Sequence, residues 1–326
     1  MSRSLSRRQF GLAACAGILI AARAQGAAAG IPVPGTGRKV AACGDDFEDE
    51  AWEYFPNGPK SSYNIDKTIR TPGGISKNDR WFEAALRGQP DVIKRVPTPE
   101  GGIPGSEGSL LLATKYSGVP GRRSNEAQQD DLIANVKTKL GGLLPVWQTP
   151  NVTTRVYVPQ VDKWERRNGG SFGFRAGLRA THTKEGDREE YWPGFFIQTM
   201  FQRDQHGGVH PTAQFTIRSD IYGRDIQGPK IDGPGWWTLG MTFTPDGQVH
   251  YFGKSGVDDL TEEDHLASYF PYKYRAYAIE AFFYNVICMD DGNTWSTQWI
   301  VDDPALYVAT PADKNRMASP QGATRG

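Results

Sequence analysis

The closing stretch Gln298-Trp-Ile-Val-Asp-Asp-Pro-Ala-Leu-Tyr-Val308 is an apolar strand interrupted by two adjacent aspartates. A second acidic stretch, Cys43-Gly-Asp-Asp-Phe-Glu-Asp49, lies near the other end of the chain, and Trp52 follows it. Two acidic, strand-like segments at the start and the finish predict terminal strands that pair with each other. The segments between them then supply the remaining strands of a sandwich.

Between these ends, apolar and polar residues alternate with the period of two that is typical of half-buried β-strands. The alternation is clearest over residues 171–180 and 195–201, and it recurs over residues 154–158, 213–219, 237–243, 249–252 and 277–288. The turn Pro245-Asp-Gly-Gln248 joins two of these segments as a hairpin. The chain shows no strand–helix–strand rhythm, so the predicted fold class is all-β, an antiparallel β-sandwich.

Two segments depart from this alternation. Thr261-Glu-Glu-Asp264 has the spacing of a capping box and predicts one short helix. Residues 56–145 are rich in turn-forming Pro and Gly, although the leucines at 110–112 begin a strand. The polar residues 118–131 predict a loop. We therefore expect long Pro/Gly-rich loops around the sandwich.

Residues 1–29 are predicted to lie outside the folded domain. Ser6-Arg-Arg-Gln-Phe10 precedes the apolar run 11–22, and small-residue cleavage sites follow. This order resembles a twin-arginine export signal, which implies recognition by the twin-arginine machinery and a periplasmic or secreted mature protein. The apolar run is too short and too rich in Ala and Gly to predict a membrane span.

The charges of the chain cancel, with 37 basic and 37 acidic residues. No global field therefore favours nucleic acid or an anionic membrane as a partner. Two cysteines remain once the signal is removed, Cys43 and Cys288. Because an exported protein sits in an oxidising compartment, a disulfide between them and a pair of buried free thiols are the two alternatives.

Three segments together resemble the concanavalin A-like lectin/glucanase superfamily, jelly-roll sandwiches that include laminin-G-like domains. They are Asp46-Phe-Glu-Asp49 with Trp52, Gly235-Trp-Trp-Thr-Leu-Gly-Met-Thr-Phe-Thr-Pro-Asp-Gly-Gln-Val-His-Tyr251, and Ile300-Val-Asp-Asp303. The resemblance implies a jelly-roll domain over residues 45–310, between a linker at 30–44 and a flexible tail at 311–326. Such sandwiches host lectins, hydrolases, lyases and inert modules, so the fold does not determine the function.

The resemblance also implies a structural calcium ion near the terminal strands. Calcium prefers several oxygen ligands in a flexible geometry. If the terminal strands are adjacent, the carboxylates that would supply these ligands are Asp46, Glu48, Asp302 and Asp303. The alternative is a pair of solvated acidic strand ends.

Polar side chains share one parity along the central strands, opposite the apolar residues. These ligand-binding candidates are Arg175, Arg179, Gln198, Gln214 and Arg218. In a curved sandwich, one sheet face packs the core and the other forms a concave groove. Guanidinium groups suit carboxylate or sulfate groups, and Trp236 is expected to stack on a sugar face. The predicted function is recognition of a polysaccharide, with an acidic one as the expected ligand; the alternative is a solvated face whose arginines pair with carboxylates.

An enzyme that uses the same groove is the second prediction. Polysaccharide lyases on jelly rolls neutralise a uronate with Arg or Gln and move a proton with His or Tyr, so the catalytic candidates are Glu280, Tyr284 and His210. Glu185-Gly-Asp187-Arg-Glu189 has the carboxylate spacing of a retaining glycoside hydrolase, but its flanking charges favour an exposed turn. A structural or interaction module of the cell envelope is the third alternative. An acid/base pair in the groove would favour the enzyme.

Overall fold

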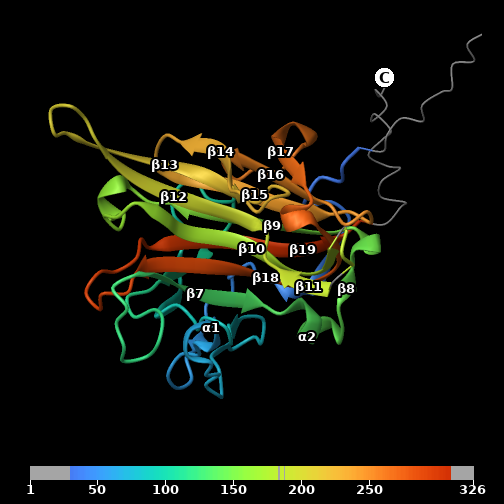
Figure 1. Cartoon of the computed structure of the whole chain (residues 1–326), viewed down its shortest axis with the longest axis horizontal. Coiled ribbons are helices and arrows are strands. Elements are labelled where there is room, and N and C mark those ends of the chain that lie inside the picture. Colours follow the sequence, from blue (N-terminus) through green and yellow to red (C-terminus); the bar gives the residue numbers. More distant parts are fainter. Residues whose placement is uncertain (1–29, 183, 187, 310–326) are drawn as a thin grey trace, which may run out of the picture. The chain divides into compact units, whose positions relative to one another are not determined.

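Two antiparallel sheets pack face to face around the core of the computed structural model (Figure 1). The structure describes residues 30–182, 184–186 and 188–309, so the twin-arginine segment and the predicted tail lie outside the described residues. The described helices are all short, and none is long and apolar enough to cross a membrane. The chain has the predicted all-β fold, a jelly-roll β-sandwich.

Sheet A has the strand order β17 (His265–Tyr269), β16 (Val249–Ser255), β15 (Gly235–Phe243), β9 (Pro150–Val158), β19 (Trp299–Val308), β6 (Gly108–Ala113) and β5 (Val92–Pro97). Strand β1 (Arg38–Gly44) also pairs with β19. Sheet B has the order β14 (Ile226–Ile231), β13 (Val209–Arg218), β12 (Gly194–Arg203), β10 (Gly169–His182), β18 (Tyr274–Met289), β7 (Ala127–Ala134), β4 (Phe82–Glu83), β3 (Ile75–Ser76) and β2 (Tyr54–Phe55). Two short strands, β11 (Arg188–Tyr191) and β8 (Leu144–Pro145), flank β10 and β18.

The terminal strands pair with each other, which confirms the prediction from the closing stretch. Arg38 lies opposite Val308, and Gly44 lies opposite Ala305. The backbone N–H of Asp45 then donates to the carbonyl of Pro304 at 2.9 Å. The pairing strand is Arg38–Gly44, so it takes up half of the segment that was assigned to a linker, and the acidic residues 45–49 that were predicted to form the strand follow it outside any strand.

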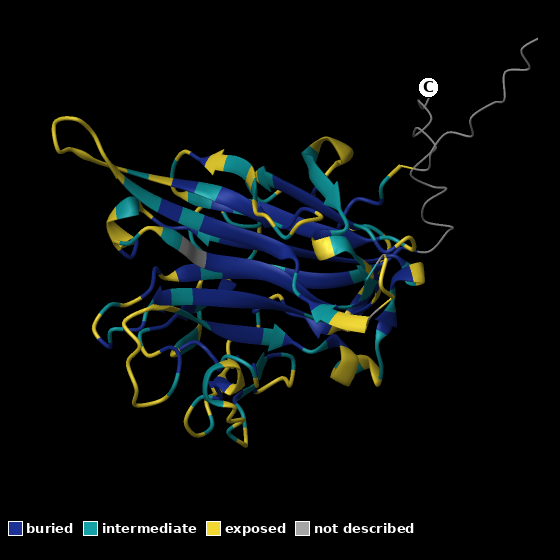
Figure 2. Ribbon diagram, viewed as in Figure 1, coloured by how far each residue is buried: buried dark blue, intermediate teal, exposed yellow. Residues whose placement is uncertain are grey.

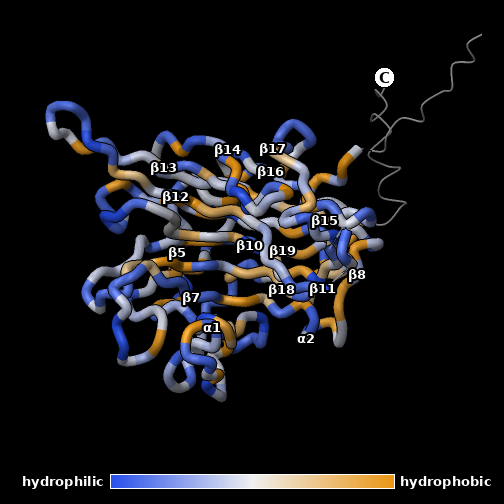
Figure 3. Tube along the Cα trace, viewed as in Figure 1, coloured by the Kyte–Doolittle hydropathy of each residue, from blue (hydrophilic) through white to orange (hydrophobic). Residues whose placement is uncertain are grey.

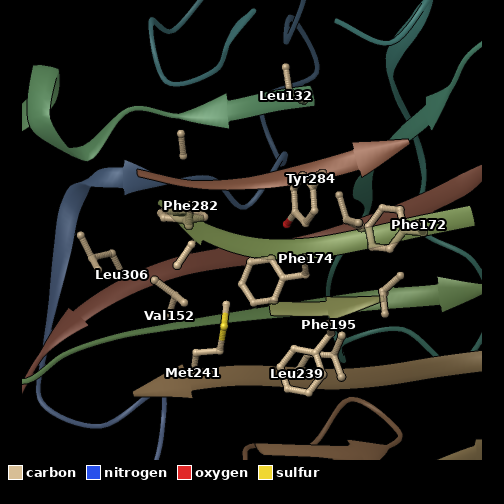
Figure 4. Packing of buried hydrophobic residues seen from close by; sticks show 14 of the residues in the cluster. Leu132, Val152, Phe172, Phe174, Phe195, Leu239, Met241, Phe282, Tyr284 and Leu306 are labelled. Atoms are coloured by element: carbon tan, nitrogen blue, oxygen red, sulfur yellow. The ribbon is translucent and has the colours of Figure 1, made fainter. Parts of the chain in front are cut away.

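The core lies between the sheets and is aromatic on the sheet B side. Figure 4 shows Phe174 and Tyr284 facing Val152 and Met241 across the sandwich. Burying one such side chain contributes about 1.5–3 kcal/mol, so this layer dominates folding. Figure 2 shows buried central strands and exposed loops, and in Figure 3 apolar and polar positions alternate along those strands.

The region 56–145 was predicted to be mostly loop, but it contributes strands to both sheets. Strand β7 lies partly within the polar stretch 118–131, which makes that loop prediction wrong. Its residues alternate, with Leu132 buried in the core and Asp131 on the other face. Pairing with β18, directly opposite Tyr284 and Asn285, holds this polar segment as a strand.

The helices are shorter and more numerous than predicted. The expected helix is the 3-10 helix η3 (Glu262–Asp264), and both arms of its capping box, between Thr261 and Asp264, are present. Two α-helices, α1 (Tyr63–Asp66) and α2 (Val136–Leu140), lie in the region that was predicted to be loop.

The two cysteines are free thiols, so the disulfide alternative is wrong and the buried-thiol alternative holds. Cys43 lies in β1 of sheet A, whereas Cys288 lies in β18 of sheet B, where its Sγ is 3.3 Å from Ser117 Oγ. Burial raises the pKa of the Cys288 thiol to about 12, so the group is neutral at physiological pH.

Candidate binding groove on the outer face of sheet B

Two rows of side chains cross the outer face of sheet B, the face turned away from the core. Strand register places one row in the order Ile133, Phe283, Arg175, Gly194 and Arg218, from β7 to β13. The next row is Asp131, Asn285, Gly173, Phe196 and Thr216. The period of two along each strand therefore gathers charged, amide and aromatic groups from five strands on one surface.

The glycines in these rows make room for their large neighbours. A Cβ on Gly194 would lie 2.7 Å from the side chain of Arg175 and 2.3 Å from the carbonyl oxygen of Phe174. A Cβ on Gly173 would lie 2.7 Å from Asn285 Oδ1. All three distances are shorter than real Cβ contacts, so glycine at these two positions leaves the space that the Arg175 and Asn285 side chains occupy.

Arg175 is buried between two aromatic rings at the centre of this face. Its guanidinium lies 5.1 Å from the ring centre of Phe196 and 5.5 Å from that of Phe283. Its Nε donates to the carbonyl of Trp192 at 2.9 Å. Burial lowers the pKa of Arg175 to about 10, and the nearby Asp131 opposes this effect, so the group is charged at neutral pH. The sheet thus holds a cation in a fixed orientation.

Asp131 and Asn285 form a buried polar pair beside Arg175. Asn285 Nδ2 donates to Asp131 Oδ1, and Gln129 Nε2 donates to the same oxygen at 3.2 Å. Desolvation raises the pKa of Asp131 to about 6. Asn285 Oδ1 is buried without a hydrogen-bond partner in the described part of the chain, which costs free energy.

Two hollows lie over these rows and share part of their lining. The first encloses about 360 Å³ over Arg175, Asp131 and Phe283. The second encloses about 880 Å³ towards Gln198 and Ile287. Arg87, Gln129, Arg218 and Asn64 line both hollows, so together they form one groove, which we call the sheet B groove.

The segment that carries α1 forms one wall of the sheet B groove. The backbone N–H of Asn64 donates to the carbonyl of Leu86 at 3.0 Å, and Asp131 N–H donates to the carbonyl of Gly88 at 3.1 Å. Lys60 anchors this wall: its Nζ lies 2.6 Å from the buried Asp130 and 2.7 Å from Asp91. These bonds attach the wall to the same strand, β7, that supplies Asp131.

Carboxylates pair with some of the arginines in and beside the sheet B groove and not with others; Arg179 lies beside the groove and lines neither hollow. Arg218 makes two hydrogen bonds to Asp225, of 2.8 and 2.7 Å. Arg179 donates to Glu280 and lies 3.5 Å from Glu190. Within residues 30–309, apart from the undescribed 183 and 187, neither Arg87 nor Arg175 has a carboxylate within ion-pair distance.

The structure brings most of the predicted binding residues to one sheet, and Trp236 to the other. Gln198 lines the groove, and Gln214 on the same face donates to the carbonyl of Gly228 at 2.9 Å. Trp236 lies in β15 of sheet A, is buried, and packs on Tyr157 with ring centres 5.4 Å apart. It borders a separate hollow of about 380 Å³.

The three catalytic candidates do not converge. His210 is exposed in the β12–β13 hairpin and pairs with Asp204 at 2.7 Å. Tyr284 points into the core, where its hydroxyl lies 2.7 Å from Thr154 Oγ1. Glu280 lines the groove. Glu280 and Tyr284 were both predicted to face the groove, but they lie on opposite faces because β18 bulges between Ala281 and Ile279, which turns Glu280 outward.

The four carboxylates proposed for calcium accept hydrogen bonds from the protein. Asp302 is buried and accepts from Ser106 Oγ at 2.8 Å, and Asp303 pairs with Arg155 at 2.9 Å. Glu48 accepts from the backbone N–H of Glu107 at 3.1 Å, and Asp46 accepts from Glu48 N–H at 3.3 Å. In the described ranges no three acidic, His or Cys side chains gather as a metal site, and each of these four carboxylates already has a partner in the protein.

Sequence reasoning missed Asp131, Asn285, Arg87 and Trp192. Asp131 was overlooked because its strand was taken for a loop. Asn285 follows Tyr284 in β18. Because Tyr284 was predicted to face the groove, its neighbour Asn285 was assigned to the opposite face. The signal that was present is the short apolar run Leu132-Ile-Ala134, which is compatible with a strand and follows directly on Asp131.

Comparison with known proteins gives fold likeness alone. A carbohydrate esterase from the Shiga toxin-encoding bacteriophage phi24B is 12% identical, with a TM-score of 0.44, and the match covers 72% of this chain and 92% of the other. An endo-beta-1,4-glucuronan lyase from the fungus Trichoderma reesei is 12% identical (TM-score 0.36; 80% and 96% covered), and peanut lectin is 10% identical (TM-score 0.35; 79% and 98% covered). No family model and no curated protein matches the chain. The identities and TM-scores are too low to indicate a function.

Replacing Asp131 by Asn is expected to flatten the dependence of stability on pH. The raised pKa means that the folded state binds a proton more tightly than the unfolded state, whose Asp pKa is near 3.8. Stability therefore falls as pH rises from about 4 to about 6, and the Asn variant lacks this contribution. Urea unfolding at several pH values measures the slope; an unchanged slope would show that Asp131 titrates normally.

Proposed function

We propose that the sheet B groove binds a polysaccharide and that it prefers acidic polysaccharides to neutral ones. The observation that carries the proposal is a pair of guanidinium groups, Arg87 and Arg175, that line a hollow of about 360 Å³ with no carboxylate at ion-pair distance in the described residues. Burial of the Arg175 guanidinium costs free energy that Asp131, which lies beyond ion-pair distance, offsets only in part, and binding a carboxylate or sulfate would recover more of it.

The other lining groups suit a carbohydrate. Gln129, Gln198 and Asn64 offer amide donors and acceptors for sugar hydroxyls, and Asn285 Oδ1 lacks a donor. Trp192 is half-buried at the end of the first hollow and provides an apolar surface for a ring. Apolar surface combined with a few oriented polar groups is the usual composition of a ligand site.

The test is retention of the protein on gels that contain uronate-bearing, sulfated or neutral polysaccharides. We expect retardation on acidic gels, weakening as salt rises because exposed charges are screened beyond about 8–10 Å. Equal behaviour on acidic and neutral gels would remove the charge preference, and no retardation on any gel would remove the binding function.

Polysaccharide cleavage at the same groove is the second candidate function. The observation that favours it is Asp131, a buried carboxyl with a raised pKa in the first hollow, which Glu190 and Glu280 also line. Incubation with the polysaccharides that bind, followed by assays for unsaturated and reducing ends, decides between the two functions. New ends that disappear in the Asp131→Asn variant support cleavage, and intact polymer supports binding alone.

We also propose that the protein is exported through the twin-arginine pathway, on the strength of Ser6-Arg-Arg-Gln-Phe10. Replacing Arg7 and Arg8 by lysine is expected to hold the precursor in the cytoplasm, because the pathway reads the arginine pair. Cell fractionation and blotting measure the location. Undiminished export of the double-lysine form would contradict the proposal.

A further inference from the structure

An exposed aromatic ring lies on the loop next to Arg218, outside the lining of the sheet B groove. Tyr222, in the loop 219–225 between β13 and β14, is 65% exposed. The guanidinium of Arg224 lies 5.1 Å from the centre of its ring, and Lys273 Nζ lies 5.4 Å from the same centre. An aromatic surface flanked by two cations thus faces solvent.

Hydrogen bonds hold this loop in one conformation. Asp220 Oδ1 accepts from the backbone N–H of Tyr222 at 2.7 Å and from that of Arg224 at 2.9 Å. The N–H of Tyr272 donates to the carbonyl of Asp220 at 3.1 Å. Gly223 has a φ of 79°, and its Cβ would lie 2.4 Å from the Tyr272 ring, so glycine lets that ring pack on the loop.

The second segment of this surface has a strained backbone. Tyr272 and Lys273 are consecutive residues with φ of 56° and 65°, the left-handed region that non-glycine residues rarely adopt. Backbone strain of this kind is concentrated at ligand sites in folded proteins. It places Tyr272 against Gly223 and Lys273 beside Tyr222.

The loop is continuous with the groove. Asp225, at the end of the loop, holds Arg218, which lines both hollows. A ligand that leaves the groove past Arg218 therefore meets Tyr222 next.

We propose that Tyr222, Arg224 and Lys273 form an outer subsite that stacks one sugar ring of an acidic polysaccharide and contacts its acidic group. The inference rests on the proposed function and extends the bound length of the same ligand. Tyr222 supplies the apolar face, as aromatic rings do wherever one side of a ligand is apolar and the other wet. Arg224 pairs with Asp220 at 2.7 Å, whereas Lys273 has no carboxylate at ion-pair distance in the described part of the chain, so Lys273 provides the free positive charge.

The test compares Tyr222→Ala with wild type on uronic acid oligomers of increasing length, from a disaccharide to a long oligomer, by calorimetry. The wild-type affinity is expected to rise with length until the outer subsite is filled. Tyr222→Ala is expected to bind the disaccharide normally and to bind the long oligomer about tenfold more weakly. Tyr222→Phe keeps the ring and is expected to behave as wild type.

Tyr116→Ala is the matched control, because Tyr116 is also exposed, at 56%, and also lies beside a lysine, at 5.2 Å, but lines neither hollow. It is expected to bind every oligomer as wild type does. If wild type binds and Tyr222→Ala matches it at every length, the outer subsite is refuted and the groove stands. If wild type binds no uronic acid oligomer, the outer subsite is refuted, and the polysaccharide gels alone decide whether the groove binds another polysaccharide.

Discussion

Replacing Lys60 by methionine is expected to lower the free energy of unfolding by about 3–5 kcal/mol. The Lys60 ammonium lies 2.6 Å from Asp130, whose side chain is fully buried, and it also donates to the carbonyl of Tyr116 at 2.8 Å. Methionine fills similar space but leaves the Asp130 carboxyl buried without a counter-charge. Urea unfolding measures the loss.

The pH dependence of the free energy of unfolding tests independently whether the Lys60→Met variant is destabilised by an unpaired Asp130 carboxylate. Desolvation raises the pKa of Asp130, and Lys60 opposes the rise, so removing Lys60 raises it further. The variant then gains stability relative to wild type as pH falls, because a protonated Asp130 needs no partner. Lys39→Met is the matched control: Lys39 pairs with Asp303 at 3.2 Å but is half exposed, so its loss costs less than about 1 kcal/mol. Equal losses for both variants would contradict the anchoring role of Lys60.

Replacing Arg218 by alanine is expected to weaken binding of an acidic polysaccharide by about 1–3 kcal/mol, or roughly 5- to 150-fold. The change removes a cation that lines both hollows and leaves Asp225 as an unpaired negative charge near the ligand. Affinity electrophoresis or calorimetry measures the loss. The fold is expected to persist, because Arg218 lies outside the core.

Asp225→Ala is the matched control for this variant. It frees the Arg218 guanidinium from its two hydrogen bonds and is expected to strengthen binding of an acidic ligand. The two changes at one ion pair therefore have opposite expected signs. If both weaken binding equally, the ion pair acts by holding the loop, and Arg218 does not contact the ligand.

The alternation of residues was enough to predict the central strands and the faces of their side chains. Arg175 and Arg218 were placed on one surface by parity alone, and register confirms that they belong to one row. Parity works there because β10, β12 and β13 are long and each has one face in the core. The pairing of the chain ends was predicted as well, although the strand that pairs with β19 lies just before the acidic stretch from which the prediction was made.

Predicting faces from alternation failed where a strand contains a bulge. It also failed where pairing with a distant strand, and not the local sequence, makes the segment a strand. The bulge in β18 adds one residue at Glu280, and a single added residue reverses the faces of the residues that follow until the next bulge, between Ala278 and Ala276. Strand β7 begins with polar residues, and its pairing with β18 is a contact between distant parts of the chain that local propensity does not contain. The wall of the sheet B groove that carries α1 and is anchored by Lys60 depends on contacts of the same kind.

Binding of polysaccharide in the sheet B groove is best tested with a variant in which a bulky side chain fills the groove. Gly177 lines the first hollow, and a Cβ there would make an ordinary 3.7 Å contact with Ala281, so Gly177→Phe is expected to fold and to fill the hollow. Gly233→Phe, which fills the hollow near Trp236, is the control. Melting temperatures are measured first to show that both variants fold. Gly177→Phe is then expected to lose retention on acidic polysaccharide gels, whereas Gly233→Phe is expected to keep it. Full retention by a folded Gly177→Phe would contradict binding in the sheet B groove.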